Sequence, residues 1–63
     1  MIKPGDRVSL KHGRAEMEGI VLKTWTGDRD VVKAEIEVER EGKAPLVLTR
    51  NVVFLTKTEE NLP

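Results

Sequence analysis

The 63-residue sequence predicts a single all-β domain of five short antiparallel strands that close into a small barrel. Three observations lead to this prediction. Apolar and polar residues alternate along the middle of the chain, turns rich in glycine and proline separate the apolar segments, and no segment has a helical period. Closure into a barrel would remove the exposed strand edges that promote aggregation.

The N-terminal residues predict a turn, a strand and a loop. In residues 3–6, proline presets φ at the first central position of a turn and glycine supplies a positive φ at the second. Residues 7–11 alternate as a strand whose apolar side chains, Val8 and Leu10, point inward. Residues 12–18 are polar and contain a glycine, so we expect a mobile loop there.

The central part of the chain predicts two further strands. Residues 20–26 are β-branched and aromatic, and Gly19 before them would permit a bend. Residues 26–30 have the composition of a turn. The clearest alternation covers residues 32–39, which predicts a strand with one buried and one solvated face; its apolar members are Val32, Ala34, Ile36 and Val38.

The C-terminal part predicts a hairpin and a closing strand. Residues 40–43 contain glycine in the position for a tight hairpin, and residues 44–50 resume as a strand that begins next to a proline. A short helical turn at residues 51–53 would precede a fifth strand at 54–57. We therefore expect the barrel to span residues 1–57, followed by a disordered polar tail at 58–63.

The composition excludes several classes of protein. There is no cysteine, which excludes a disulfide framework and a thiolate metal site, and a single histidine, His12, has no companion ligand. The sequence has neither the pattern of a signal peptide nor a long apolar stretch, so we expect a cytoplasmic protein that makes no membrane contact. Eleven basic and eleven acidic side chains give a net charge of zero, which provides no overall attraction to nucleic acid.

The stretch from Gly5 to Leu22, GDRVSLKHGRAEMEGIVL, resembles the KOW motif of ribosomal proteins and transcription elongation factors. In that family a Gly-Asp pair precedes a strand, one glycine closes the strand and another opens the next; Gly13 and Gly19 occupy these places. The resemblance implies an SH3-like barrel that contacts RNA or RNA polymerase. The sequence departs from the family pattern at Glu16 and Glu18, which would repel a phosphate backbone in a loop that is commonly basic.

The chain is also similar to the short barrel of plasmid-encoded type II dihydrofolate reductase. The similarity lies in the Gly-Asp-Arg-Val opening, the aromatic Trp25 at the end of the second strand and the Val-Val-Phe-Leu segment near the C-terminus. In that family a tetramer surrounds a pore, and a Gln-Ile-Tyr segment binds substrate. Leu48-Thr49-Arg50 stands there in this chain, so the resemblance implies a shared shape without the shared reaction.

These observations favour a non-catalytic binding or accessory module in a transcription, translation or nucleic-acid-handling complex. Its partner would be a protein or a weakly held nucleic acid, contacted by Lys11, His12, Arg14, Lys23 and Trp25. We expect no catalytic residue, metal or cofactor. The alternatives are a homo-oligomeric structural protein and a small oligomeric enzyme with its site at a symmetry axis.

Two features have more than one interpretation. Trp25 is either the anchor of an interface, where tryptophan is enriched, or a lid packed over the mouth of the barrel. Four glutamates at alternating positions from Glu35 to Glu41 form an acidic stripe on the third strand and its hairpin. The stripe either protects a solvated face or docks a basic partner, and Lys23 and Arg50 are expected to face it across the sheet.

Overall fold

The computed structural model describes residues 1–58, which form five strands and two single-turn 3-10 helices. The elements are β1 (Arg7–His12), β2 (Ala15–Thr26), η1 (Asp28–Asp30), β3 (Val32–Arg40), β4 (Lys43–Asn51), η2 (Val52–Phe54) and β5 (Thr56–Lys57). None of the helices in this part of the chain is long and apolar enough to cross a membrane.

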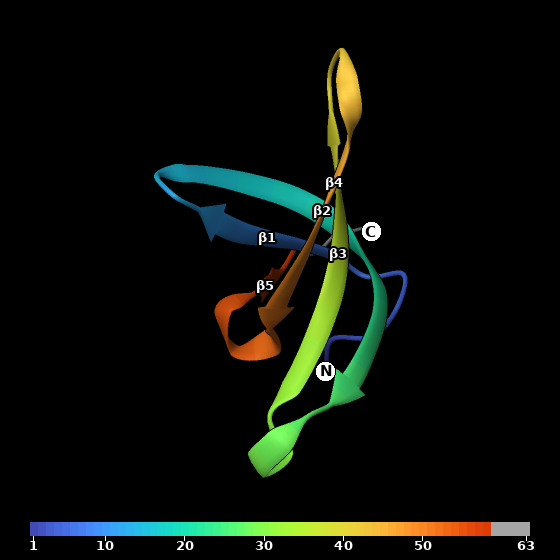
Figure 1. Cartoon of the computed structure of the whole chain (residues 1–63), viewed down its shortest axis with the longest axis vertical. Coiled ribbons are helices and arrows are strands. Elements are labelled where there is room, and N and C mark those ends of the chain that lie inside the picture. Colours follow the sequence, from blue (N-terminus) through green and yellow to red (C-terminus); the bar gives the residue numbers. More distant parts are fainter. Residues whose placement is uncertain (59–63) are drawn as a thin grey trace, which may run out of the picture.

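All five strands belong to one antiparallel sheet with the order β4-β3-β2-β1-β5 (Figure 1). This arrangement confirms the predicted all-β class and the five antiparallel strands. Within residues 1–58, however, β4 and β5 do not pair, so the sheet is open. Closure into an SH3-like barrel over residues 1–57 therefore stays a prediction.

The predicted mobile loop at residues 12–18 is wrong. β1 and β2 pair continuously from Arg7↔Ile20 to His12↔Ala15, and only two residues connect them. The first of these, Gly13, has a φ of +67°, which is the arrangement of a type II′ hairpin turn. The alternation was hidden in the sequence because the inward positions of this part of β2 are held by alanine, methionine and glycine rather than by large β-branched residues.

The other predicted elements agree with the structure within a few residues. The N-terminal turn has Gly5 at a φ of +94°, and the strand predicted at residues 32–39 is β3. The fifth strand is shorter than expected, because Phe54 ends η2 and β5 begins only at Thr56. Thr58 donates its backbone N–H to Arg7 O at 2.9 Å; the remainder of the predicted tail, residues 59–63, lies outside the described residues.

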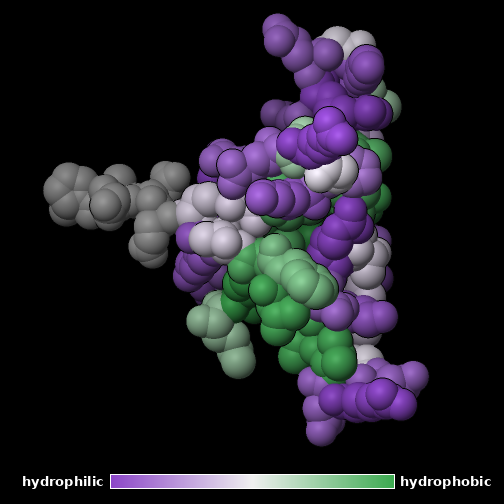
Figure 2. Space-filling view, turned by 90° about the vertical axis from the view of Figure 1, so that its left-hand side faces the viewer, coloured by the Kyte–Doolittle hydropathy of each residue, from purple (hydrophilic) through white to green (hydrophobic). Residues whose placement is uncertain are grey.

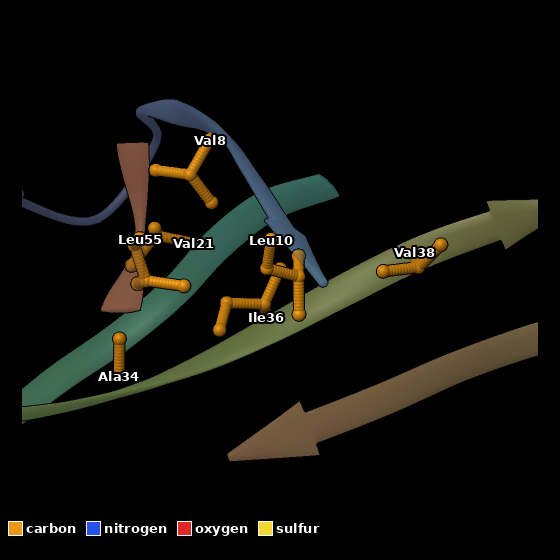
Figure 3. Packing of buried hydrophobic residues seen from close by; sticks show 7 residues of the cluster. All are labelled: Val8, Leu10, Val21, Ala34, Ile36, Val38 and Leu55. Carbon is orange, nitrogen blue, oxygen red and sulfur yellow. The ribbon is translucent and has the colours of Figure 1, made fainter. Parts of the chain in front are cut away.

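The core lies on the inner face of the sheet, where seven small aliphatic side chains meet (Figure 3). β3 supplies three of them at alternate positions, as its period predicts, whereas Val32, the first apolar residue of the predicted series, is 37% exposed. The buried side chains are Val8, Leu10, Val21, Ala34, Ile36, Val38 and Leu55. Leu55 reaches this core from the segment between η2 and β5, so its burial adds to the β1–β5 pairing in holding the C-terminal part of the described chain to the sheet.

A β-bulge in β2 reverses which side chains face the core. The pairing shifts by one residue between Val21↔Ile36 and Lys23↔Glu35, which leaves Leu22 as the extra residue. Val21 is buried on the inner face, but after the bulge Thr24 takes the inner position opposite Ala34. Trp25 therefore points to the outer face, where it is 38% exposed.

Gly19 marks the point where the sheet divides into two arms. Residues 15–19 of β2 pair with β1 alone, whereas β3 pairs with β2 only from Ile20 onwards. The β1–β2 and β3–β4 hairpins consequently point in different directions (Figure 1). At this division a methyl group on Gly19 would lie 2.7 Å from the carbonyl oxygen of Glu37 and 2.6 Å from Cγ2 of Ile36. The close approach of the two strands requires glycine.

We therefore expect Gly19→Ala to lower the free energy of unfolding by about 2 kcal/mol or more, because β3 would have to move away from β2. Gly27→Ala is the matched control, since its new methyl group would be no closer than 3.7 Å to any neighbour and should change stability by less than about 0.5 kcal/mol. Urea denaturation of both variants measures the difference, and equal stabilities would contradict the close approach.

Asp6 connects the N-terminal turn to β5. Its carboxylate accepts hydrogen bonds from Lys3 N at 3.0 Å and Lys3 Nζ at 3.1 Å, and Lys57 Nζ lies 3.6 Å away. The backbone hydrogen bond from Lys3 is the main cause that lowers the pKa of Asp6 below its ordinary 3.8. Desolvation opposes it, and the side-chain hydrogen bond from Lys3 and the charges of Lys3 and Lys57 lower the pKa further.

Because the folded state lowers this pKa, ionised Asp6 stabilises the fold above pH 3.8 and loses that effect as the pH falls through the lower, folded value. Asp6→Asn should therefore reduce stability at pH 7 and make it less sensitive to acid. Urea midpoints at pH 7 and at about pH 2 provide the measurement. Asp28→Asn, at a carboxylate with no ion pair among residues 1–58, should leave the acid dependence as in the parent protein.

Candidate binding cleft

An open cleft of about 510 Å³ lies between β1, the end of β4 and the segment that contains η2 and β5. This is the side on which the open sheet lacks a ladder between its terminal strands. The lining residues are Ser9, Leu10, Lys11, Glu16, Arg50, Phe54 and Thr56. We call this feature the β1 cleft. Its volume falls in the range of sites that hold a small molecule or a few residues of a peptide.

The apolar part of the β1 cleft comes from Leu10 and Phe54. Leu10 belongs to the core, whereas Phe54 is 69% exposed, and its neighbour Val53 is 79% exposed. Figure 2 shows an apolar patch on this side of the molecule, bordered by hydrophilic side chains. Exposed phenylalanine beside a cleft is a feature of interfaces rather than of an isolated surface.

The backbone of β1 offers hydrogen-bonding groups to the same cleft. Arg7 O accepts from Thr58 N, and Ser9 pairs with Thr56, so the odd-numbered residues of β1 direct their backbone groups toward β5. Lys11 has the same orientation, but β5 does not extend that far. Its N–H and C=O therefore face the β1 cleft without a strand partner among residues 1–58. An extended peptide could pair with this edge.

Arg50 bridges the gap between the two halves of the open sheet. It lies on the inner face of β4, opposite Ala34 of β3. Its Nη2 is 3.0 Å from His12 Nδ1, and its Nη1 donates to Thr49 O at 2.9 Å. A guanidinium group only donates hydrogen bonds, so Nδ1 of His12 must be the acceptor. This side-chain contact spans the place where barrel closure was predicted.

The structure gathers some of the predicted binding residues at the β1 cleft. Lys11 lines it, and His12 lies beside it through the contact with Arg50. Arg14 is exposed in the turn at the end of the β1–β2 hairpin and does not line the cleft. The charges lining the cleft are two cations, Lys11 and Arg50, and one carboxylate, Glu16. Glu16 lies opposite Lys11 in the register of β1 and β2.

Lys23 and Trp25 form a separate pair on the outer face of β2. Lys23 lies about 23 Å of extended strand beyond Glu16, the cross-strand neighbour of Lys11. Lys23 Nζ is 5.5 Å from the centre of the Trp25 ring, within the range of a cation–π contact. Trp25 is therefore covered in part by its own neighbour and does not line the β1 cleft.

Only one of the two basic residues expected to face the acidic stripe does so. Lys23 lies opposite Glu35, as expected. Arg50 does not face the stripe, because its position on β4 is an inner one and its side chain turns toward His12. The expectation for Arg50 is wrong because this residue continues the inward series of Leu46 and Leu48 on β4.

Sequence analysis missed most of the residues that line the β1 cleft. Ser9 lies between the inward-facing Val8 and Leu10 on β1, but its contact with the cleft depends on the position of η2. Phe54 was assigned to the fifth strand, where alternation would have given it one face of the sheet. The signal that could have found Arg50 is its place two residues after Leu48 on a strand whose even-numbered residues face inward.

No group of three or more His, Cys, Asp and Glu side chains within residues 1–58 is arranged to hold a metal ion. No protein-family model, curated protein or solved structure matches this chain. The resemblances to the KOW motif and to type II dihydrofolate reductase therefore stay predictions from the residues that carry them.

The contact between Arg50 and His12 predicts the tautomer of the imidazole. Neutral His12 should carry its proton on Nε2, because Nδ1 accepts from Arg50. Long-range proton–nitrogen correlation spectra at neutral pH measure this directly. Arg50→Ala should reduce the preference for this tautomer, and a spectrum of the parent protein dominated by protonated Nδ1 would contradict the contact.

Proposed function

We propose that this chain is a non-catalytic binding module that holds an extended segment of a protein partner in the β1 cleft. The observation that carries the proposal is the combination, in one place, of an exposed aromatic ring, an apolar floor and an unpaired backbone edge. Phe54 and Leu10 can hold an apolar side chain of the partner, while Lys11 N–H and C=O can pair with its backbone.

The charges of the β1 cleft favour a segment with an acidic residue. Arg50 projects into the cleft opposite the β1 edge, and Lys11 adds a second cation, whereas Glu16 is the single carboxylate of the lining. A carboxylate of the partner placed beside Arg50 would form a charge-assisted hydrogen bond at the edge of an apolar contact. This arrangement supports a peptide that alternates apolar and acidic side chains.

Nucleic acid is supported less well by the same geometry. Of the cations expected to contact phosphates, Lys11 lies opposite Glu16 and Lys23 lies opposite Glu35. The two cations lie on different parts of the sheet, and each has a carboxylate opposite it that would repel a phosphate backbone. A protein partner is therefore the function we propose.

The experiment is selection of random 12-residue peptides displayed on phage against the intact chain. We expect enriched peptides whose synthetic forms shift the amide resonances of Lys11, Arg50 and Phe54. Phe54→Ala should weaken their binding by about tenfold or more, because the ring is the exposed apolar anchor. Val53→Ala is the matched control: its side chain is adjacent and even more exposed than that of Phe54, but it does not line the cleft.

Two outcomes would contradict the proposal. One is a set of enriched peptides whose binding depends equally on Val53 and Phe54. The other is the absence of enriched peptides together with shifts at Lys11, Arg14 and Lys23 when a 12-nucleotide single-stranded RNA is added at about 50 mM salt. The second result would favour nucleic acid as the partner. Resonance shifts that are confined to basic residues and become smaller as the salt concentration rises indicate contacts with phosphates.

A further inference from the structure

The outer edge of β4 is the longest free strand edge in the described part of the chain. β4 is the terminal strand of the sheet and pairs with β3 on one side, and no residue from 1 to 58 pairs with its other side. Its central residues carry no charge from Ala44 to Thr49 and are apolar as far as Leu48. An edge of this kind is a template for another strand unless something blocks it.

The direction of each backbone group on β4 follows from the strand register. Arg40 and Lys43 close a two-residue turn, so they must exchange hydrogen bonds with each other, and Val38 and Ile36 therefore also face β4. Their partners Leu46 and Leu48 face back toward β3. The pairing of β2 gives the same result. Val21 N donates to Asp6 O, so the backbone groups of the preceding Ile20 point the other way, toward β3. The pair Ile20↔Glu37 is therefore hydrogen-bonded, and Glu37 faces β2 rather than β4.

Alternation then directs the remaining backbone groups of β4 outward. Val47 presents both its N–H and its C=O at the free edge, and Thr49 does the same. Because N–H of Leu46 points to β3, the carbonyl of Pro45 on the same planar peptide points outward. Proline has no N–H, so the free edge lacks one donor at Pro45. One acceptor at this edge is already occupied, because Thr49 O accepts from Arg50 Nη1 at 2.9 Å.

The missing donor at Pro45 and the occupied acceptor at Thr49 lie opposite each other when a two-fold axis at Val47 relates two β4 strands. In an antiparallel pair of β4 strands centred there, Val47 lies opposite Val47 of the second copy, and Pro45 lies opposite Thr49 of the second copy. Each Thr49 N–H can donate to the Pro45 carbonyl across the axis. The donor that proline lacks would have served Thr49 O, which is the carbonyl that Arg50 already satisfies. No backbone group between Pro45 and Thr49 is left without a partner.

The side chains are compatible with the same pairing. Val47 is 49% exposed on the outer face, and the axis would place the two Val47 side chains against each other. On the inner face, half-buried Leu46 would meet Leu48 of the second copy and extend the apolar surface of both cores. At the ends, Lys43 would face Asn51 and Arg50 would face Ala44, so no like charges lie directly opposite each other.

We propose that β4 is a self-association edge, through which a second copy of this chain pairs by a two-fold axis at Val47. The contact is closed, because each β4 edge is used by the other, and it joins two sheets of five strands into one of ten. It does not depend on the function proposed for the β1 cleft, because the pairing uses residues 45–49 of β4, none of which lines the cleft.

The test uses the property that residue 47 meets itself. Sedimentation equilibrium should show a concentration-dependent dimer for the parent protein. Val47→Glu and Val47→Lys should each raise the dissociation constant by about tenfold or more, because like charges would face each other at the axis. An equimolar mixture of the two variants should recover the dimer, since the opposite charges then pair.

Leu22→Glu is the matched control, since Leu22 has a similar exposure of 43% but lies at the bulge in β2, away from this edge. It should leave the dimer intact. A parent protein that remains monomeric at millimolar concentration would overturn the proposal. So would a mixture of Val47→Glu and Val47→Lys that stays monomeric while circular dichroism shows both variants folded.

Discussion

The close approach of β2 and β3 at Gly19 is the constraint on which the rest of the structure depends. Without a side chain at this position, the carbonyl of Glu37 can lie against β2 at the point where the two strands separate. The separation lets the β1–β2 hairpin and the β3–β4 hairpin diverge around a core of seven small aliphatic side chains. Among residues 1–58, part of β1 and the outer edge of β4 have no strand partner in this open sheet, and these are the two surfaces to which we assign binding.

Two irregularities in the strands decide which residues those surfaces present. The bulge at Leu22 turns Trp25 away from the core and places it next to Lys23, which removes it from the β1 cleft. The register shift opposite Glu39 on β3 gives β4 one extra residue at Ala44 and Pro45. Without this shift the backbone groups of Pro45 would face β3 instead of the free edge. The missing N–H of proline would then interrupt the β3–β4 ladder.

The two free edges differ in how they are protected. At β1, the edge beyond Ser9 is short and is flanked by the exposed ring of Phe54, which suits recognition of a different, extended chain. At β4, a missing proline donor and a carbonyl satisfied by Arg50 discourage most strands, yet they complement each other when the same strand approaches by a two-fold axis. Arg50 serves both edges, because its other nitrogen contacts His12 across the gap in the sheet.

The sequence by itself determined the all-β class, the five strands and the identity of most core residues, because alternation and turn residues act over a few neighbouring positions. Ile36 and Val38 could be assigned to the core from β3 alone. The sequence could not show the continuation of β2 through residues 15–19, since small inward residues there carry no alternation of large apolar side chains. Only the tertiary structure decided the orientation of Trp25, because a one-residue bulge reverses the facing of every later side chain on β2. It alone also decided the place of Phe54 and the contact of Arg50 with His12, because these join segments that meet only after the sheet has bent.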